Sequence, residues 1–398
     1  MLNISLLGFF STIHSNSPLI TSSFSSSNIA VKNFRIYNSF NSLFRLSTLT
    51  NLKVSDCSYL HFLSSPIYQS ALENQVYHET LKIDEQNVSI INCKFIDCKS
   101  QNPGAAIHVD NGNTNLVVCR SIFHNCRCEG KGGAIYANMN HFICSHNFFH
   151  LCRCGKNNGN DGSTVYAYSK IGVNTSFVSA NECPKHGEMC WYGILIMCNG
   201  VLKSENINIS NSDVEFISGL AHFRPAKDQS YLLFYTSINQ IHGNALAFID
   251  FSFDGYHSYG SLVNDSTTSG IFYVQNATTK LQNYYFLNNN GPITYACVGN
   301  SKGNFENCFF DTKYGENLGI GFGTAINCKW EQKNIPTLNM KILQHNNMNF
   351  NKIIILQRYK NNNFKVIINV LIVLVLILAI YKYNEKIRNS WRSIKHKT

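Results

Sequence analysis

The residues best suited to acid–base chemistry lie in and around the segment AFIDFSFDGYH. Asp250 and Asp254 stand four residues apart there, with His242 and His257 nearby. Glycosidases use two carboxyl groups roughly 5 to 9.5 Å apart, whereas four residues of an extended strand span about 13 Å. The spacing therefore favours a solvated strand end followed by an Asp-Gly turn. A polysaccharide lyase or hydrolase, with the two carboxylates brought together by a turn, is the alternative.

Sequence motifs for other catalytic chemistry are missing. The chain has no Ser-His-Asp spacing, no glycine-rich phosphate loop and no HExxH motif. Its fifteen cysteines include no CxxC pair, and the two CxC pairs, Cys126 with Cys128 and Cys152 with Cys154, are only a weak indication of metal binding. We therefore predict a non-catalytic protein without a cofactor or a metal site.

The net charge of +10 is concentrated at the carboxyl end. Residues 352–398 hold ten Lys/Arg and one Glu, which leaves +1 for the rest of the chain. Nucleic-acid binding is unsupported, because the larger part of the chain has no excess of basic residues. The basic residues flank the apolar run VIINVLIVLVLILAIY, Val366 to Tyr381, which we interpret as a single transmembrane helix.

The positive-inside rule places the basic tail in the cytoplasm and the preceding domain outside the cell. The amino-terminal segment is a poor secretory signal, so a tail-anchored intracellular scaffold is a further alternative. Asn-x-Ser/Thr sequons, which suit an external domain, occur at Asn3, Asn87, Asn174, Asn208, Asn264 and Asn276. The predicted segments are 1–25 (signal-like segment or cap), 26–335 (ectodomain), 336–363 (Asn-rich cap and linker), 364–384 (membrane helix) and 385–398 (cytoplasmic tail).

A repeat with a period near 28 residues organises the ectodomain. GAAIHV begins at Gly104, GGAIYA at Gly132 and GSTVYA at Gly162. Apolar residues recur every second position within each copy, as in β-strands, and short copies that stack on one another are typical of solenoids. The corner of each coil requires positive φ or close backbone packing. We assign this role to Gly104, Gly132, Gly133 and Gly162.

Stacking of the coils predicts columns of equivalent side chains. Ile107, Ile135 and Val165 form an inward column, and the neighbouring residues His108, Tyr136 and Tyr166 form an outward aromatic strip that we predict to bind a glycan or protein partner. The alternative is that the three side chains only stabilise the pairing of neighbouring strands. Predicted cysteine columns are Cys98 with Cys126 and Cys152, Cys119 with Cys144 on the inward face, and Cys128 with Cys154, either as thiol ladders or as disulfides.

The repeat resembles that of the polymorphic outer-membrane protein family, whose relatives include surface proteins of parasitic protists. Gly132 to Ile135 matches the family's Gly-Gly-Ala-Ile box, and Phe286 to Asn289 keeps its Phe-x-x-Asn box, whereas Cys98 and Cys126 replace the Asn elsewhere. The resemblance implies a right-handed parallel β-helix with an adhesive or antigenic surface. We therefore expect an all-β fold, a right-handed parallel β-helix with a single carboxyl-terminal transmembrane α-helix, acting as a membrane-anchored surface adhesion scaffold.

Overall fold

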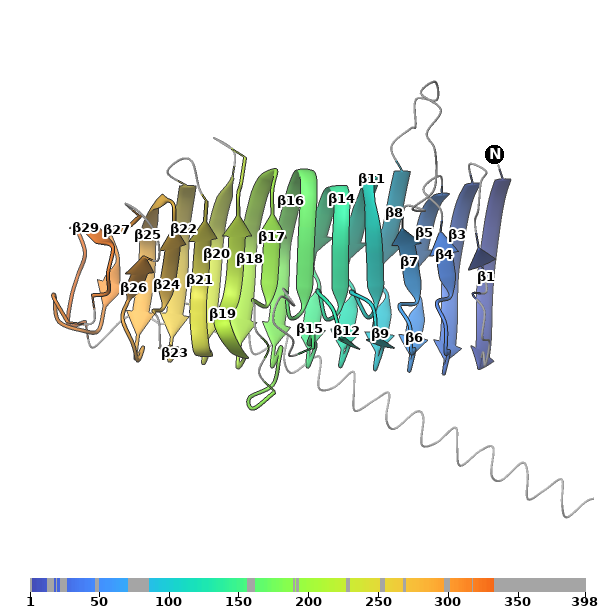
Figure 1. Ribbon diagram of the computed structural model, residues 1–398, viewed down its shortest axis with the longest axis horizontal. Coiled ribbons are helices and arrows are strands. Elements are labelled where there is room, and N and C mark those ends of the chain that lie inside the picture. Colours follow the sequence, from blue (N-terminus) through green and yellow to red (C-terminus); the bar gives the residue numbers. More distant parts are fainter. Residues whose placement is uncertain are drawn as a thin grey trace, which may run out of the picture. The chain divides into compact units, whose positions relative to one another are not determined.

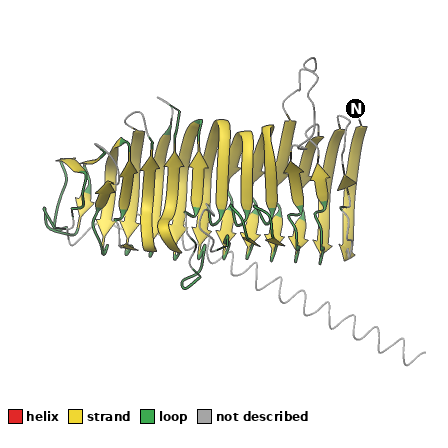
Figure 2. Ribbon diagram, in the orientation of Figure 1, coloured by secondary structure: helices red, strands yellow, loops and turns green. Residues whose placement is uncertain are grey.

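The computed structural model consists of strands and loops in all the residues that it describes (Figure 2). These are residues 2–12, 18, 20–21, 27–46, 50–70, 86–155, 162–188, 190, 193–226, 230–250, 255–267, 270–296, 301–316 and 318–332, and they belong to one compact unit, Met1–Ile335. All strand pairings in this part of the chain are parallel. The predicted parallel β-solenoid is therefore confirmed.

The first face of the solenoid is a ladder in which each strand pairs with its counterpart in the next coil (Figure 1). Its longest strands bend and also contribute to other faces, with register shifts such as that between Asn111 and Asn115. In order, the ladder consists of β1 (Leu2–Thr12), β3 (Ser27–Tyr37), β5 (Thr50–Ser55), β8 (Gln86–Ile91), β11 (Ile107–Cys119), β14 (Ile135–Ser145), β16 (Val165–Asn181), β18 (Val201–Ser210), β20 (Tyr231–Ile238), β22 (Gly255–Val263), β25 (Thr278–Leu287), β27 (Lys302–Glu306) and β29 (Phe322–Ile326).

The second face precedes the first in each coil, and it includes the first halves of β11, β14 and β16. Its other strands are β2 (Ile20–Thr21), β4 (Phe44–Leu46), β7 (Ile67–Ser70), β17 (Leu195–Cys198), β19 (Asp213–Phe223), β21 (Ile241–Ile249), β24 (Phe272–Gln275) and β26 (Thr294–Ala296). The third face contains β6 (Ser58–Leu60), β9 (Lys94–Ile96), β12 (Ile122–His124), β15 (Phe148–His150) and β28 (Phe309–Phe310). Short pairings add β10 (Lys99–Ser100) with β13 (Arg127–Cys128), and β23 (Ser266–Thr267) with β21.

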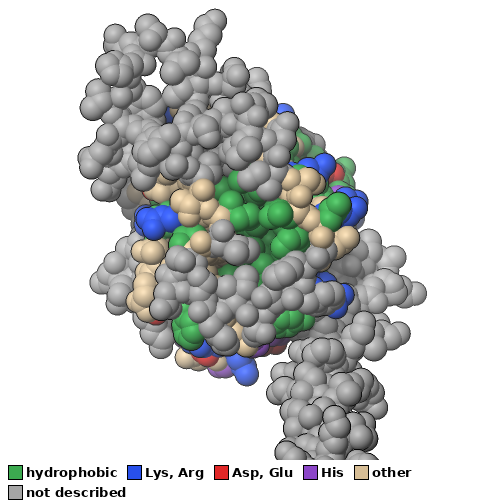
Figure 3. All heavy atoms as spheres, turned by 90° about the vertical axis from the view of Figure 1, so that its right-hand side faces the viewer, with side chains coloured by type: hydrophobic (Ala, Val, Ile, Leu, Met, Phe, Trp, Pro, Cys, Tyr) green, Lys and Arg blue, Asp and Glu red, His purple; other side chains and the backbone are tan. Residues whose placement is uncertain are grey.

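The core lies inside the coils and is built from the predicted inward columns. Ile107, Ile135 and Val165 are aligned in register and buried, as expected. On the third face, Phe95, Phe123 and Phe149 are fully buried and stack with ring centroids 5.0 and 4.7 Å apart. Seen from the end that carries β1, hydrophobic side chains gather in the middle of the cross-section and Lys and Arg side chains lie toward its rim (Figure 3).

Residues with positive φ form the corners between faces and change which side chains point inward. Asn92 has a φ of 54°, so Val88 and Ile90 are buried before it and Cys93 and Phe95 after it. The alternation of inward and outward side chains is therefore interrupted at the corner, and Ile91 does not share a face with Cys93. Asn is favoured at such corners because it tolerates left-handed backbone conformations.

The predicted fold class, an all-β solenoid joined to a transmembrane α-helix, is corrected to an all-β parallel β-solenoid. Every regular element in the described residues is a strand, since apolar side chains recur every second residue along these segments. No helix long and apolar enough to cross a membrane occurs among them. The predicted helix at 364–384, the linker at 336–363 and the tail at 385–398 lie outside the described residues.

Candidate functional site

The predicted aromatic strip on the second face is a continuous ladder. His108 and Tyr136 stack with ring centroids 5.1 Å apart, and Tyr136 and Tyr166 follow at 5.8 Å with nearly parallel planes. The strands align these three residues in register. Tyr68 on β7 extends the ladder, with its ring 4.5 Å from that of His108. Sequence reasoning missed Tyr68 because it lies forty residues before His108, outside the period of 28.

The rings of the ladder are less accessible to solvent than aromatic side chains that do not stack on one another. His108 is only 6 % exposed, and its Nδ1 lies 2.9 Å from the carbonyl oxygen of Pro103. Burial lowers the pKa of His108, and burial likewise raises the pKa of Tyr136 to about 12. Because each inner ring has aromatic neighbours on both sides, stacking within the ladder uses ring faces that a ligand would need.

Basic side chains lie over the outer rings of the ladder. The guanidinium of Arg45 is 5.8 Å from the ring centre of Tyr68, and the Lys131 ammonium is 4.7 Å from that of Tyr166. Both distances are within the range of cation–π attraction. The ladder therefore combines aromatic side chains with positive charge.

The corner glycines have the predicted geometry. Gly104, Gly132 and Gly162 have φ values of 69°, 66° and 69°. Gly133 serves close packing, since a Cβ atom there would lie 2.1 Å from the carbonyl oxygen of Ser163. The glycines thus let one coil approach the next, and they are part of the scaffold rather than of a ligand site.

Two of the three predicted cysteine columns are present. Cys98, Cys126 and Cys152 occupy equivalent positions, because Lys99 pairs with Arg127 and Arg127 in turn pairs with Arg153. The same pairings align Cys128 with Cys154. Cys183 and Cys190 extend the columns, since the Cys152 amide donates to the Cys183 sulfur at 3.3 Å and the Cys190 thiol donates to the Cys154 carbonyl at 3.3 Å.

The third predicted column is wrong by one residue. Cys144 pairs with Val118, and Cys119 pairs with Ser145. Cys119 therefore lies outside the core while Cys144 is buried. The two cysteines are 25 residues apart in sequence, whereas the paired residues of the two strands are 26 apart.

The cysteines that the structure describes form no disulfide bonds with one another, and most are buried. Burial raises the pKa of Cys128 and of Cys144 to about 12, and it holds the pKa values of Cys126 and Cys152 well above the usual range. These sulfurs remain protonated near neutral pH and pack as small apolar groups. No group of three or more His, Cys, Asp or Glu residues in the described ranges is arranged to hold a metal ion.

The candidate catalytic residues do not form one cluster. Asp250 lies at a corner, where its Oδ2 accepts a hydrogen bond from Arg224 Nε at 3.2 Å and its Oδ1 accepts one from Asn276 at 2.8 Å. His257 is buried inside the coils, stacked on Phe248 at 3.9 Å. His242 contacts Asp213 instead, at 2.7 Å. Asp254 lies outside the described residues.

A second apolar cluster lies on the outer side of the second face, where the ladder ends. It consists of alternate residues whose neighbours in sequence point into the core, and Tyr166, Phe216 and Phe223 pack against it. Its members are Ile196, Cys198, Ala221, Ala247, Ile249 and Tyr273. Sequence reasoning missed this cluster because its coils depart from the period of the earlier repeats.

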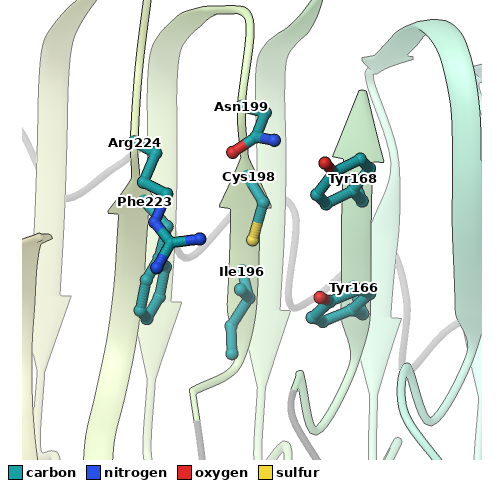
Figure 4. Close-up of a pocket in the computed structure, with 7 residues that line it drawn as sticks. All are labelled: Tyr166, Tyr168, Ile196, Cys198, Asn199, Phe223 and Arg224. Atoms are coloured by element: carbon teal, nitrogen blue, oxygen red, sulfur yellow. The ribbon is translucent and has the colours of Figure 1, made fainter. Parts of the chain in front are cut away.

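A depression of about 280 Å³ opens beside this cluster (Figure 4). It has Ile196 and Cys198 of β17 at its floor, with longer side chains from β16 and β19 on either side. The remaining lining residues are Tyr166, Tyr168, Asn199, Phe223 and Arg224. Strand β17 is therefore the place where the outward ladder of rings is interrupted.

The fold and this outer face define a parallel β-solenoid with an outward aromatic ladder. Comparisons with known proteins assign it to no narrower class, because no family model, no curated protein and no solved structure matches the chain significantly. The fold class rests on the strand pairing and on the aligned columns alone.

Proposed function

We propose that this protein is a non-catalytic binding scaffold, a β-solenoid displayed at the cell surface that attaches to glycan or protein partners. The observation that carries the proposal is the outer side of the second face. There an aromatic ladder from Tyr68 to Tyr166 continues into an apolar cluster that extends to Tyr273. Aromatic side chains on the outer side of a strand face, beside an open depression, are typical of interaction sites.

The geometry of the solenoid supports attachment to an extended partner. Neighbouring coils present equivalent side chains about 4.8 Å apart, so the same chemistry recurs along the axis. A polymer or an extended protein segment can contact several coils at once, and repeat proteins commonly use such surfaces for binding. The matches at Gly132 to Ile135 and Phe286 to Asn289 support our further proposal that the repeat is of the polymorphic outer-membrane protein type.

Exposed sequons support display outside the cell. Asn87, Asn174, Asn264 and Asn276 are exposed, so an oligosaccharide could be attached to each without disturbing the core. We expect an epitope tag near residue 25 to stain on intact cells, while a tag at Thr398 stains only after permeabilisation. We also expect N-glycosidase treatment to increase the electrophoretic mobility of the protein. If both tags stain only after permeabilisation, display at the cell surface is wrong.

Attachment is measured with beads that carry the full-length protein, applied to intact cells and to immobilised polysaccharides. We expect saturable attachment, and we expect the double variant Tyr136→Ser, Tyr166→Ser to attach more weakly while keeping the circular dichroism spectrum of the parent. Absence of attachment by the parent protein would reject the binding function. Release of reducing or unsaturated sugar ends, lost in Asp250→Asn, would instead establish the enzymatic alternative.

A further inference from the structure

The depression beside Tyr166 has a simple cause in the strand register. Tyr168 on β16 pairs with Cys198 on β17, and Cys198 pairs with Phe223 on β19. Since neighbouring strands lie about 4.8 Å apart, the two aromatic residues are about 10 Å apart with a short side chain between them. The volume of about 280 Å³ lies near the lower end for ligand pockets, so it suits one small ring rather than a larger molecule.

The floor and one wall of the depression are apolar. Ile196 and Cys198 are nearly fully buried, at 1 % and 8 % exposure. The Phe223 side chain flanks them from β19, and Tyr166 and Tyr168 extend from β16 on the opposite side, with their hydroxyl groups toward the floor residues (Figure 4). A ligand seated here would lay an apolar face on carbon and sulfur atoms while its edges met hydroxyl groups.

Polar groups from the adjacent corner complete the site. Asn199 and Arg224 follow the last residues of β17 and β19, and the backbone N–H of Asn199 donates to the Phe223 carbonyl at 2.9 Å. The Arg224 side chain is 73 % exposed, and its guanidinium group projects toward the floor of the depression in Figure 4.

Asp250 orients this guanidinium group through one of its nitrogen atoms only. Its carboxylate contacts Arg224 Nε at 3.2 Å and is itself anchored by Asn276 at 2.8 Å. A guanidinium has five N–H donors, so the two terminal nitrogens remain available for a second acceptor. Their planar geometry matches a carboxylate, which they can bind through two parallel hydrogen bonds.

We propose that this depression binds one six-membered sugar ring that carries a carboxylate, as a residue of a linear acidic glycan. The apolar floor and Phe223 would contact the C–H face of the ring, the tyrosine hydroxyls and Asn199 its hydroxyl groups, and Arg224 its carboxylate. A flat aromatic ligand would contact the same floor but would offer no hydroxyl groups to Tyr168 and Asn199. The inference rests on the proposed binding function and names its ligand class.

The test is calorimetric titration of the full-length protein with a hexamer of galacturonic acid. A hexamer in which the carboxyl groups are methyl esters serves as the uncharged probe. We expect the acid hexamer to bind at least tenfold more tightly than the ester. Arg224→Gln should weaken binding of the acid at least tenfold, and Arg224→Lys should restore only part of it because the bidentate geometry is lost.

A second variant tests the depression without removing a charge. Cys198→Phe places a ring in the space between Tyr168 and Phe223, and it should abolish binding of both hexamers. Cys119 also faces outward but lies on the first face. The matched variant Cys119→Phe should therefore bind both hexamers like the parent. Urea denaturation of each variant confirms that it is folded.

The outcomes separate this inference from the proposed function. Absence of hexamer binding, or equal binding by the parent, Arg224→Gln and Cys198→Phe, overturns the acidic-sugar site. If beads still attach to cells in that case, the scaffold function stands with a different contact surface. If the beads do not attach but the titrations show the expected losses, the sugar site stands and the adhesive function is wrong.

Discussion

The coils around β14 and the coils around β21 share one fold but differ in what they place inside and outside it. Around β14 the interior columns are aliphatic side chains, phenylalanine rings and thiols, and the outer face has a ring in each rung. Around β21 the interior includes His222, His257 and Asp265, all fully buried, and the outer face has Ala221, Ala247 and Ile249 in place of a continuous ladder of rings.

The comparison indicates that regular repetition of the coils favours stability. A coil that departs from the repeat can leave room for a ligand. In the regular coils each side chain stacks on an equivalent one, so little space or unmatched polarity is left. Where β17 substitutes Ile196 and Cys198 for aromatic residues, a depression appears. The most regular repeat is therefore the scaffold, and the candidate ligand site lies where the repeat is weakest.

The largest effect should come from breaking a regular interior column. Phe123 is fully buried between Phe95 and Phe149, so Phe123→Ala leaves a cavity that the rigid coils on either side cannot fill. We expect the free energy of unfolding to fall by about 3–5 kcal/mol, measured by urea denaturation. Phe177→Ala is the matched control, because Phe177 is 51 % exposed and stacks only at a corner. A loss at Phe177 equal to that at Phe123 would contradict the assignment of the core.

The second prediction concerns the buried titratable groups around β21. Burial lowers the pKa of His222 to about 3 and that of His257 well below its usual range, so both take up protons on unfolding near pH 5. The unfolded state then binds more protons than the folded state, and their contribution to stability is lost as the pH falls below about 6.5. Each such histidine should contribute a slope that approaches about 1.4 kcal/mol per pH unit near pH 5.

His222→Gln tests this assignment because Gln keeps a partner for the Ser204 hydroxyl, which lies 2.9 Å from His222 Nε2, but does not titrate. Stability should depend less steeply on pH in this variant.

Asp265 gives a control of opposite sign. Burial raises its pKa to about 7, so the folded state holds the extra proton, and Asp265→Asn should make stability rise more steeply with pH. Identical slopes in all three proteins would show that these buried groups do not govern acid unfolding.

Much of the regular region follows from sequence alone. The step of 28 residues from Gly104 to Gly132 aligned the strands and columns correctly, because equivalent residues of a solenoid must stack. Simple alternation does not predict which side chains near a corner point into the core. Positive φ at residues such as Asn92 shifts the alternation, and a pattern of apolar residues does not reveal that shift in advance.

The candidate ligand site could not be predicted from the sequence, for a related reason. Tyr168, Cys198 and Phe223 are separated by 30 and 25 residues, and no motif links them. Their common feature is the register of β16, β17 and β19, in which the step between paired residues changes from 30 to 25. Similarly, Arg224 contacts the carboxylate of Asp250, which lies 26 residues further along the chain, in the next coil.

The smallest effect should come from the outer ladder of the regular coils. Tyr136 is half-buried and has ring neighbours at 5.1 and 5.8 Å, so Tyr136→Ser should cost about 1–2 kcal/mol of unfolding free energy, well below the loss at Phe123. Tyr136→Phe keeps the ring and should stay within about 0.5 kcal/mol of the parent. Equal losses in both variants would assign the effect to the hydroxyl group. A loss in Tyr136→Ser as large as that in Phe123→Ala would mean that the outer ladder is as important for stability as the core, and the division between a stabilising interior and a binding exterior would then be wrong.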